Sequence, residues 1–361
     1  MHYPKHLNPS VYTGQSKWIA SSGISSRNCT VTCKNVPIPN DLTQQHKNHI
    51  QNNINIDFRS FGSWPKIRPI RIRAISMDVT GTLVSFRGSL SQHYVKSAEK
   101  CGVVLPKTMQ FDQAFKIAYV EISQSYPCFG YNTITGKEWW RHCVLRSFEL
   151  AGANMTEPQK DRVFQRIYSI FGSQAAYERF DDALPFLHWA NRNDIACGLL
   201  SNADERYGDS ILPMLGLTHD EIQFQCFSKY YGFEKPDHRF FMATIQRAED
   251  ALKEMEFNHC TERVESSITD NATPTMIDPL LPSQCLHVGN DYTKDFEGAR
   301  RAGMHAVLLD RYDEPELAEE WRRRGAIVLK DLMDIVEFLG RTNCQLGNSQ
   351  SKDSSLYGAQ N

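Results

Sequence analysis

The sequence has no long hydrophobic run and no excess of basic residues. No apolar stretch approaches the roughly 18 residues that a membrane-spanning helix needs. The formal net charge of −2 over 361 residues lacks the positive excess that is typical of nucleic-acid binding. With 41% hydrophobic and 23% charged residues, the composition is that of an ordinary globular protein. We therefore expect neither a membrane nor a nucleic acid as a partner.

The ten cysteines never occur at the C-x-x-C spacing of a zinc site, which argues against zinc. Several of them lie inside apolar runs, where a free thiol behaves as a small hydrophobic side chain. This usage favours a reducing compartment, and we expect a cytoplasmic location.

Acidic residues are absent from the first 40 positions, where Lys, Arg, Ser, Asn and Thr are frequent. Such a composition is typical of an organellar presequence and also of a disordered polar extension. We interpret residues 1–65 as one of these two, so a mitochondrial location is the alternative. The polar segments 260–283 and 341–361 are also predicted to be disordered.

Short apolar runs alternate with helical patterns through the rest of the chain. Strands are expected at 71–77, 194–200, 223–227, 285–288, 305–309 and 326–329, and helices at 181–193, 238–255, 293–302 and 315–324. Short strands that alternate with helices indicate a parallel sheet covered on both faces. The expected fold is a doubly wound, mainly parallel, Rossmann-like α/β sheet formed by residues 66–84 and 181–340.

Residues 85–180 separate the first two expected strands and are too long for a single crossover helix. Helical patterns recur there at 91–101, 107–123, 136–151 and 156–171. Trp140, Val144 and Phe148 form one apolar stripe and are expected in the core, while Trp139 fits a core or a pocket-facing position. A helical insertion at this point would stand over the carboxyl edge of the sheet as a cap that excludes water and selects the substrate.

The segment Asp78-Val79-Thr80-Gly81-Thr82 ends the first expected strand. An acid followed by a glycine turn at this place lies where open α/β sheets bind ligands. A carboxylate there can attack phosphorus when a metal ion screens the approaching charges. The same residues can also form an ordinary turn. The residues that follow the other strands are needed to distinguish a catalytic site from a turn.

Polar side chains also follow the next three expected strands. These residues are Ser201 and Asn202 after the second strand, Lys235 after the third, and Asn290, Asp291 and Asp295 after the fourth. Each could be a turn residue, a surface charge or a helix cap. Phosphoryl transfer, however, needs a nucleophile, a divalent cation and donors for the phosphoryl oxygens. The placement of all these groups after successive strands favours that chemistry.

These segments, in order from Asp78 to Asp295, are the motifs by which the chain resembles the haloacid-dehalogenase-like hydrolase superfamily. Further likeness lies in the segments 126–131, 139–152, 235–240, 287–289 and 303–305. The resemblance covers about residues 70–340 without the 260–283 insertion. It implies the fold expected above, with residues 85–180 as a helical cap.

The resemblance also implies a role for each residue. Asp78 would be the catalytic nucleophile and would form an aspartyl-phosphate. Ser201 and Asn202 would donate hydrogen bonds to the phosphoryl group, with Thr82 as a further phosphate contact. Lys235 would neutralise phosphate charge and, as a nearby cation, keep Asp78 ionised.

The cofactor implied by the resemblance is Mg²⁺, a hard cation suited to oxygen ligands. The Asp78 carboxylate and the Thr80 main-chain carbonyl would bind it. Asn290, Asp291 and Asp295 would hold it directly or through water.

Two positions depart from the phosphatases of this superfamily. Thr80 occupies the catalytic position of the Asp that protonates the leaving group, and loss of such an acid typically costs about 10²–10⁴-fold in rate. Asn290 replaces the Asp that follows the glycine of the last motif, so it offers an oxygen without the negative charge. Asp291, one residue later, is the candidate to compensate.

Three functions are compatible with these residues. The first is a Mg²⁺-dependent phosphatase, weak or selective, that acts on a small phosphorylated metabolite. The second is a catalytically silent protein that binds or senses a phosphate ligand, as the two departures suggest. The third is a metal-independent 2-haloacid dehalogenase, although that enzyme type has Tyr where Thr80 stands. The oligomeric state is left open.

Overall fold

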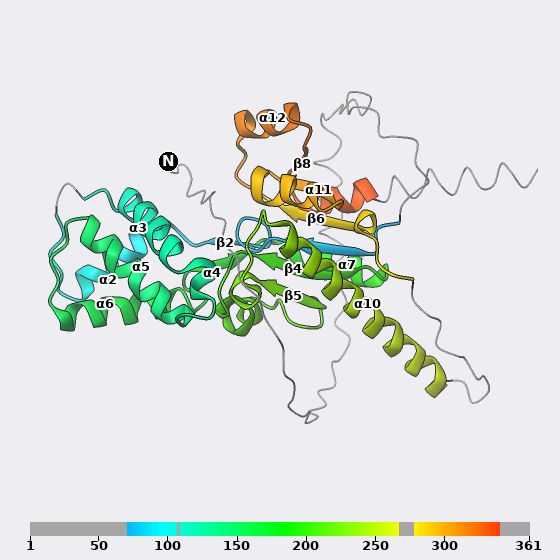
Figure 1. The fold of residues 1–361 in the computed structure, drawn as a ribbon, viewed down its shortest axis with the longest axis horizontal. Helices are drawn as coiled ribbons and strands as arrows, with labels where there is room; N and C mark the ends of the chain where they lie inside the picture. Colours follow the sequence, from blue (N-terminus) through cyan, green and yellow to red (C-terminus); the bar gives the residue numbers. More distant parts are fainter. Residues whose placement is uncertain (1–70, 107–108, 267–277, 340–361) are drawn as a thin grey trace, which may run out of the picture. The chain divides into compact units, whose positions relative to one another are not determined.

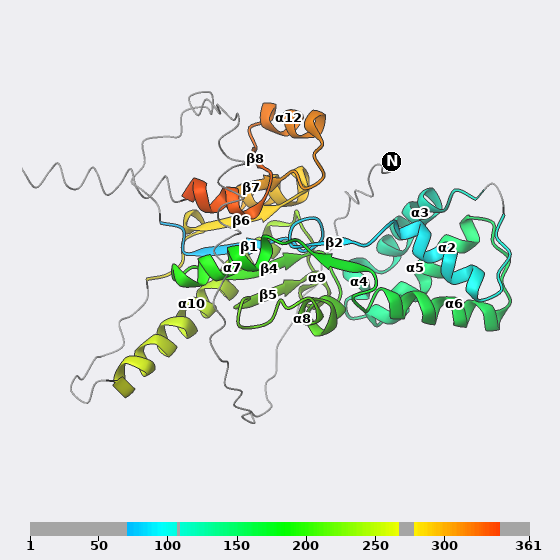
Figure 2. The same cartoon turned by 180° about the vertical axis from the view of Figure 1, so that it is seen from behind.

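The computed structural model describes residues 71–106, 109–266 and 278–339, with the side chains of residues 259–266 excepted. Figures 1 and 2 show the ribbon from opposite sides. The predicted N-terminal extension (1–65) and C-terminal tail (341–361) lie outside the described residues.

A parallel sheet organises the predicted core. Its strands are β1 (Ala74–Met77), β4 (Ala196–Ser201), β5 (Phe224–Phe227), β6 (Cys285–Gly289), β7 (His305–Leu309) and β8 (Ile327–Leu329). They lie in the order β5-β4-β1-β6-β7-β8, and every neighbouring pair is parallel. The predicted α/β fold is confirmed. Because Met77 is in register with both Leu199 and Val288, the carboxyl ends of β1, β4 and β6 lie at one edge of the sheet.

Side chains of β1 alternate between two hydrophobic cores. Ile75 and Met77 pack in the core that contains Phe186 of α7 (Ala183–Arg192). Ala74 packs in the other core, with Phe241 of α10 (His238–Ser266). The sheet is therefore covered on both faces, as Figures 1 and 2 show from the α10 and α7 sides. The other helical segments of this region are η2 (Tyr207–Ile211), α8 (Leu212–Met214), α9 (Ser228–Tyr231), η3 (Pro282–Gln284), η4 (Tyr292–Glu297), α11 (Gly298–Arg301) and α12 (Pro315–Arg323).

A helical insertion follows β1, as the sequence predicts. It begins and ends with the antiparallel pair β2 (Val84–Phe86) and β3 (Tyr177–Arg179). Its helices are α2 (Leu90–Lys100), α3 (Phe111–Ser125), α4 (Pro127–Gly130), α5 (Gly136–Leu150) and α6 (Glu157–Ile170). The side chain of Thr135 accepts a hydrogen bond from the Glu138 amide and thereby caps α5, which fixes where that helix begins.

The two adjacent tryptophans of α5 differ from the predicted pattern. Val144 and Phe148 are buried as expected. Trp140 is only partly buried: it packs against the hydrophobic core, as expected, while its Nε1 donates to the carboxylate of Asp204, just after β4. Trp139 is instead the fully buried member of the pair.

The segment α4 is a left-handed turn rather than a right-handed helix, since Cys128 and Phe129 have φ angles of 50° and 56°. Non-glycine residues adopt this conformation only where the surroundings hold them there. The Cys128 amide donates to Oε1 of Glu234 at 3.0 Å. The Lys229 ammonium donates to the carbonyl of Phe129 at 2.9 Å. Two side chains that follow β5 therefore hold this turn, which was not predicted from the sequence.

The segment 260–283, predicted to be disordered, is described at both of its ends. The helix α10 continues to Ser266, beyond its expected end at 255. Leu280 is buried in the core beneath α10, and its amide donates to Glu249 Oε2 at 3.1 Å. Residues 267–277 lie outside the described part of the chain.

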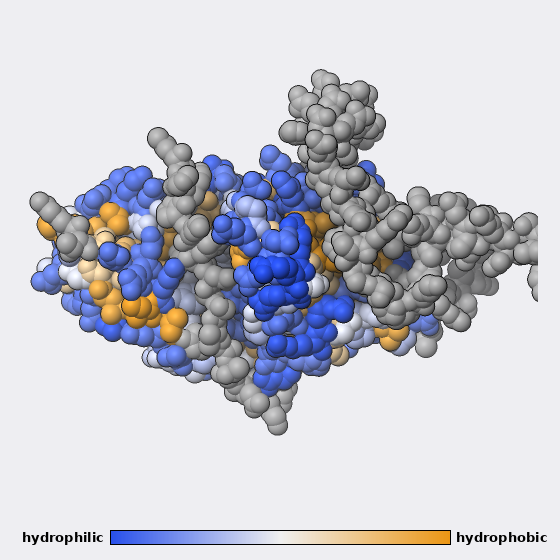
Figure 3. Space-filling model, turned by 90° about the horizontal axis from the view of Figure 1, so that it is seen from above, coloured by the Kyte–Doolittle hydropathy of each residue, from blue (hydrophilic) through white to orange (hydrophobic). Residues whose placement is uncertain are grey.

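The face in Figure 3 is mostly hydrophilic and carries separate hydrophobic areas. Exposed apolar side chains include Ile117 and Val120 of α3. Scattered apolar side chains are common on protein surfaces and identify no site by themselves. Among the described residues, no helix is both long and apolar enough to cross a membrane.

Candidate active site

Asp78 lies immediately after β1, at the edge where β4 and β6 also end. Its side-chain Oδ1 accepts hydrogen bonds from Lys235 Nζ at 2.7 Å and from Ser201 Oγ at 3.2 Å. Its main-chain N–H donates to the Val288 carbonyl at 2.8 Å. The structure thus brings together three predicted site residues that lie far apart in the sequence. Within the described residues, both of these side-chain bonds fall on Oδ1 and not on Oδ2.

Lys235 is almost fully buried and lies between two carboxylates. Its ammonium is 2.7 Å from Asp78 Oδ1 and 2.7 Å from Asp295 Oδ1. Asn202 holds the Lys235 main chain, since its Oδ1 accepts from the Lys235 N–H at 2.7 Å and its Nδ2 donates to the Lys235 carbonyl at 3.0 Å. Asn202 therefore positions the lysine, and its predicted contact with a phosphoryl group stays a prediction.

Burial and charge shift the pKa values of these groups in different directions. Burial raises the pKa of Asp78, and the attraction of Lys235 only partly opposes it. Burial also disfavours the charged form of Asp295, but Lys235 and His287 outweigh it and lower the pKa of this carboxyl. Burial alone would lower the pKa of Lys235, yet the two carboxylates raise it. The lysine is therefore a permanent cation near neutral pH.

Thr80 forms a hydrogen bond that the sequence did not suggest. Its Oγ1 lies 3.0 Å from the hydroxyl of Tyr207, in η2. Burial raises the pKa of Tyr207, so the phenol keeps its proton at neutral pH. The ring of Tyr207 packs edge-on against Tyr177 of β3, with centroids 5.8 Å apart. Thr80 is thereby linked to the strand that leads out of the helical insertion.

Asp295 is held from four directions. Its Oδ1 faces Lys235 and, at 3.1 Å, the His287 Nε2. Its Oδ2 accepts from the amides of Asn290 and Asp291 at 3.0 and 2.9 Å. Direct binding of a cation by Asp295 would require the loss of one of these bonds. As arranged, this residue organises the loop that follows β6.

Asn290 and Asp291 differ in their surroundings. The Asn290 side chain lies against Gly81, where an added Cβ would be 2.0 Å from Asn290 Nδ2 and where φ is +84°. Only glycine suits that turn. Asp291 is buried and caps η4, with Oδ1 accepting from the Lys294 amide at 2.8 Å. Its Oδ2 has no hydrogen-bond partner within the described residues, but it pairs with the Lys294 ammonium at 3.7 Å.

Thr82 is predicted to contact phosphate, but its side-chain hydroxyl forms no hydrogen bond with the other described site residues. Its side chain is fully buried, and its hydroxyl is unpaired in the part of the chain that the structure describes. Its carbonyl accepts from Arg311 Nη2 at 2.7 Å, and Arg311 also pairs with Asp182 at 2.6 Å. The structure therefore connects Thr82 to the segment after β7 and to the start of α7.

The groups that could bind a cation at this site offer oxygen atoms, the ligand type that Mg²⁺ prefers. The described residues contain no group of three or more His, Cys, Asp or Glu side chains arranged to hold a metal ion. Mg²⁺ commonly uses only one or two carboxylates and keeps several waters. Oδ2 of Asp78 and Oδ2 of Asp291, which lies 3.7 Å from the Lys294 ammonium, are oxygen donors of this kind, and the Thr80 carbonyl and the Asn290 amide oxygen can add to them.

A further cluster connects the segment after β4 to the helical insertion. Arg206 forms a salt bridge with Asp204 at 3.0 Å. Its guanidinium lies 4.3 Å from the ring centroid of Tyr168 in α6. Together with the Trp140–Asp204 bond, these contacts extend from the end of β4 to α5 and α6. Sequence reasoning missed this cluster, because nothing in the local pattern shows which residues it contacts.

The parallel sheet, with Asp78 and Lys235 brought together at its carboxyl edge, defines a doubly wound α/β protein. The family model described as haloacid dehalogenase-like hydrolase matches residues 72–303, and the chain belongs to that family. Over 241 residues it is 28% identical to the haloacid dehalogenase-like hydrolase domain-containing protein 3 of Mus musculus, covering 66% of this chain and 82% of the relative. The Homo sapiens protein of the same name is 28% identical over 242 residues, with the same shares covered. The resemblance inferred from the motifs is confirmed.

Among solved structures, the chain is similar to the putative hydrolase YfnB from Bacillus subtilis bound to magnesium. The TM-score is 0.48 at 13% sequence identity, with 75% of this chain and 99% of the other covered.

Proposed function

We propose that this protein is a phosphatase that acts on a small phosphorylated metabolite, with Asp78 as the nucleophile and Mg²⁺ as the cofactor. The observation that carries the proposal is the contact of the buried Lys235 ammonium with Asp78 Oδ1 at 2.7 Å, to which Ser201 also donates. A carboxylate presented beside a fixed cation and a hydroxyl donor suits attack on a phosphoryl group.

In the proposed reaction, one carboxylate oxygen of Asp78 forms a bond to phosphorus while the bond to the leaving oxygen breaks. Lys235 and Ser201 compensate the negative charge of the phosphoryl oxygens. Water then attacks phosphorus in a second step, which releases inorganic phosphate and restores Asp78. Bound Mg²⁺ would supply positive charge, held by Asp78, the Thr80 carbonyl and the oxygens of Asn290 and Asp291.

The hydroxyl of Thr80 limits the substrates. It cannot protonate a leaving group as a carboxylic acid does, and its neighbour Tyr207 has a raised pKa. Substrates whose leaving group is stable as an anion, such as aryl or acyl phosphates, would be hydrolysed best. The helical insertion would act as the cap over the site, which the contacts of Trp140 and Cys128 with residues after β4 and β5 support.

The test is a broad panel of phosphate esters assayed with Mg²⁺, with Asp78→Asn as the matched control. This substitution keeps the size of the side chain and removes the nucleophilic charge. We expect turnover by the wild type that the variant lacks, highest for leaving groups of low pKa. Equal rates of hydrolysis by the wild type and the variant across the panel would contradict the proposal.

A second candidate is a phosphate-binding protein without turnover, favoured by Thr80 at the acid position and Asn290 beside Gly81. Calorimetry with the same esters separates the two functions. Binding without hydrolysis would support this candidate, and the absence of binding would remove it.

A further inference from the structure

His287 is a fully buried polar side chain in β6, between the apolar residues Leu286 and Val288. Its Nδ1 lies 2.8 Å from Ser76 Oγ of β1, and its Nε2 lies 3.1 Å from Asp295 Oδ1. The rings of Phe241 and His287 are perpendicular, with their centroids 5.4 Å apart. The imidazole is thus fixed at both nitrogens and along its edge.

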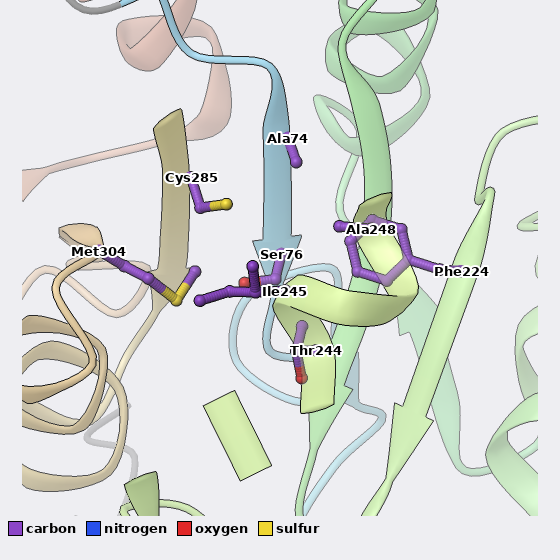
Figure 4. A pocket seen from close by; sticks show the side chains of 8 residues that line it. All are labelled: Ala74, Ser76, Phe224, Thr244, Ile245, Ala248, Cys285 and Met304. Atoms are coloured by element: carbon purple, nitrogen blue, oxygen red, sulfur yellow. The ribbon is translucent and has the colours of Figure 1, made fainter. Parts of the chain in front are cut away.

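The surroundings of Ser76 determine the direction of these hydrogen bonds. Ser76 borders a narrow space with Ala74, Phe224, Thr244, Ile245, Ala248, Cys285 and Met304, which does not admit a water molecule (Figure 4). The Thr244 hydroxyl is already used, since it donates to the Phe240 carbonyl at 2.8 Å. Within the described residues, His287 is therefore the hydrogen-bond partner of Ser76, and burial of the hydroxyl makes that bond costly to lose.

These constraints select one tautomer of His287. An ionised Asp295 can only accept a hydrogen bond, so Nε2 carries a proton. The Ser76 hydroxyl then donates to an unprotonated Nδ1. A doubly protonated ring would leave the Ser76 hydrogen without an acceptor, and burial also lowers the pKa of His287. The imidazole is neutral and donates to Asp295.

We call Ser76, His287, Asp295 and Lys235 the His287 chain, because consecutive members are hydrogen-bonded and the last one contacts Asp78. Lys235 is shared by two carboxylates. Without the His287 donor, Asp295 Oδ1 would carry more uncompensated charge and would attract the ammonium more strongly. The ammonium would then be drawn away from Asp78.

We propose that His287, oriented by Ser76, is a positioning residue whose Nε2–H keeps Asp295 in place and thereby keeps the Lys235 ammonium on Asp78. This role deepens the proposed function and rests on it for its catalytic readout. It requires no contact between His287 and the substrate.

The first experiment compares two substitutions, each of which removes one hydroxyl group that borders the narrow space. Ser76→Ala breaks the His287 chain, whereas Thr244→Val removes a hydroxyl that lies outside it. Loss of a residue that orients an active-site ligand typically costs about 10–100-fold in activity or affinity. We expect kcat in Ser76→Ala to fall several-fold with little change in KM, while Thr244→Val keeps the wild-type kcat. Equal kcat values for the two variants would overturn the proposal.

The second experiment changes the donor itself. His287→Leu removes it, and His287→Gln retains an amide N–H. We expect a fall of about 10–100-fold in kcat for the Leu variant and partial rescue by Gln. When no turnover is detected, the wild type and the variants are compared by their affinity for inorganic phosphate, measured by calorimetry. The absence of turnover then contradicts the proposed function, whereas the affinities test the role of His287. Equal binding by wild type and the Leu variant would overturn it.

Nitrogen-15 NMR of the imidazole rings needs no substrate at all. The chain has 12 histidines, and the signals of His287 are those lost in His287→Gln. We expect a ring that is protonated at Nε2 and unprotonated at Nδ1. A ring protonated at Nδ1 and not at Nε2 would contradict the His287 chain.

Discussion

On the nucleophile side of the site, Asp78 accepts hydrogen bonds from Ser201 and Lys235, as the motifs lead one to expect. On the cation side, Asn290 replaces an acid, and Asp295 directs its two oxygens at four protein donors. In the proposed reaction the first side would attack phosphorus, whereas the second would offer a cation less negative charge than two acids in sequence. Under that proposal, binding of a phosphoryl group and retention of a metal ion would depend on different residues of one fold.

Lys235→Met should have the largest effect, because both sides of the site depend on this ammonium. Removal of one partner from a buried ion pair typically costs about 3–5 kcal/mol, and we expect a loss of that size in the free energy of unfolding, together with loss of turnover. Urea denaturation measures the first quantity. As a control, Lys253→Met breaks the partly exposed pair with Glu249 and should cost less than about 1 kcal/mol. Similar losses in the two variants would contradict the central role of Lys235.

Thr80→Asp restores an acid on the nucleophile side. We expect turnover of alkyl phosphates to rise by about 10²-fold or more, with a smaller gain on aryl phosphates, whose leaving groups need less protonation. Thr80→Asn is the matched control, since it has the shape of Asp without the acid. A comparable gain in both variants would mean that general acid catalysis is not the missing component.

Asn290→Asp restores charge on the cation side. Added ligand charge strengthens the binding of hard cations, and we expect the Mg²⁺ affinity measured by calorimetry to rise on the order of tenfold. Asp291→Asn should lower it if Asp291 already compensates for Asn290. An unchanged affinity in Asn290→Asp would place the cation elsewhere.

The dependence of the free energy of unfolding on pH, in the acid range, should reflect the ionisation of Asp295. Its pKa is lowered in the folded protein, because Lys235 and His287 outweigh the opposing effect of burial. Such a carboxyl stabilises the fold above its unfolded-state pKa, and that stabilisation is lost as the pH falls towards the folded-state value. Relative to Asp295→Asn, the stability advantage of the wild type should therefore shrink below about pH 4. A constant difference from neutral to acid pH would argue against an ionised, paired Asp295.

Much of this arrangement is readable from the sequence, because short apolar runs between helical patterns predict the strands. Asp78 follows such a run directly, Ser201 ends another, and Lys235 lies in the loop between α9 and α10. The parallel sheet then brings the ends of the strands to one edge. The role of Tyr207 is not readable, since its contact with Thr80 spans 127 positions of the chain. A polar residue inside an apolar strand does mark His287 as unusual, although its partners emerge only from the packing of β1 against β6.

The two tryptophans of α5 show why a helical stripe is an incomplete guide. Spacing of four residues groups Trp140 with Val144 and Phe148, yet Trp139 is the one that is fully buried. Its Nε1 donates to the Tyr126 carbonyl at 2.9 Å, so the approach to the left-handed turn supplies a partner. Trp140 finds its partner outside the insertion, at Asp204. Contacts between distant segments determine both positions.

The left-handed turn at Cys128 has a consequence for the exchange of parts between relatives. Its backbone is held by Glu234 and Lys229, which belong to the sheet region. A chimaera that takes residues 85–180 from one protein and the remainder from another would separate the Glu234 carboxylate and the Lys229 ammonium from the peptide groups they contact. A graft of the helical insertion that carries Lys229 and Glu234 along with it should therefore fold where a simple swap fails.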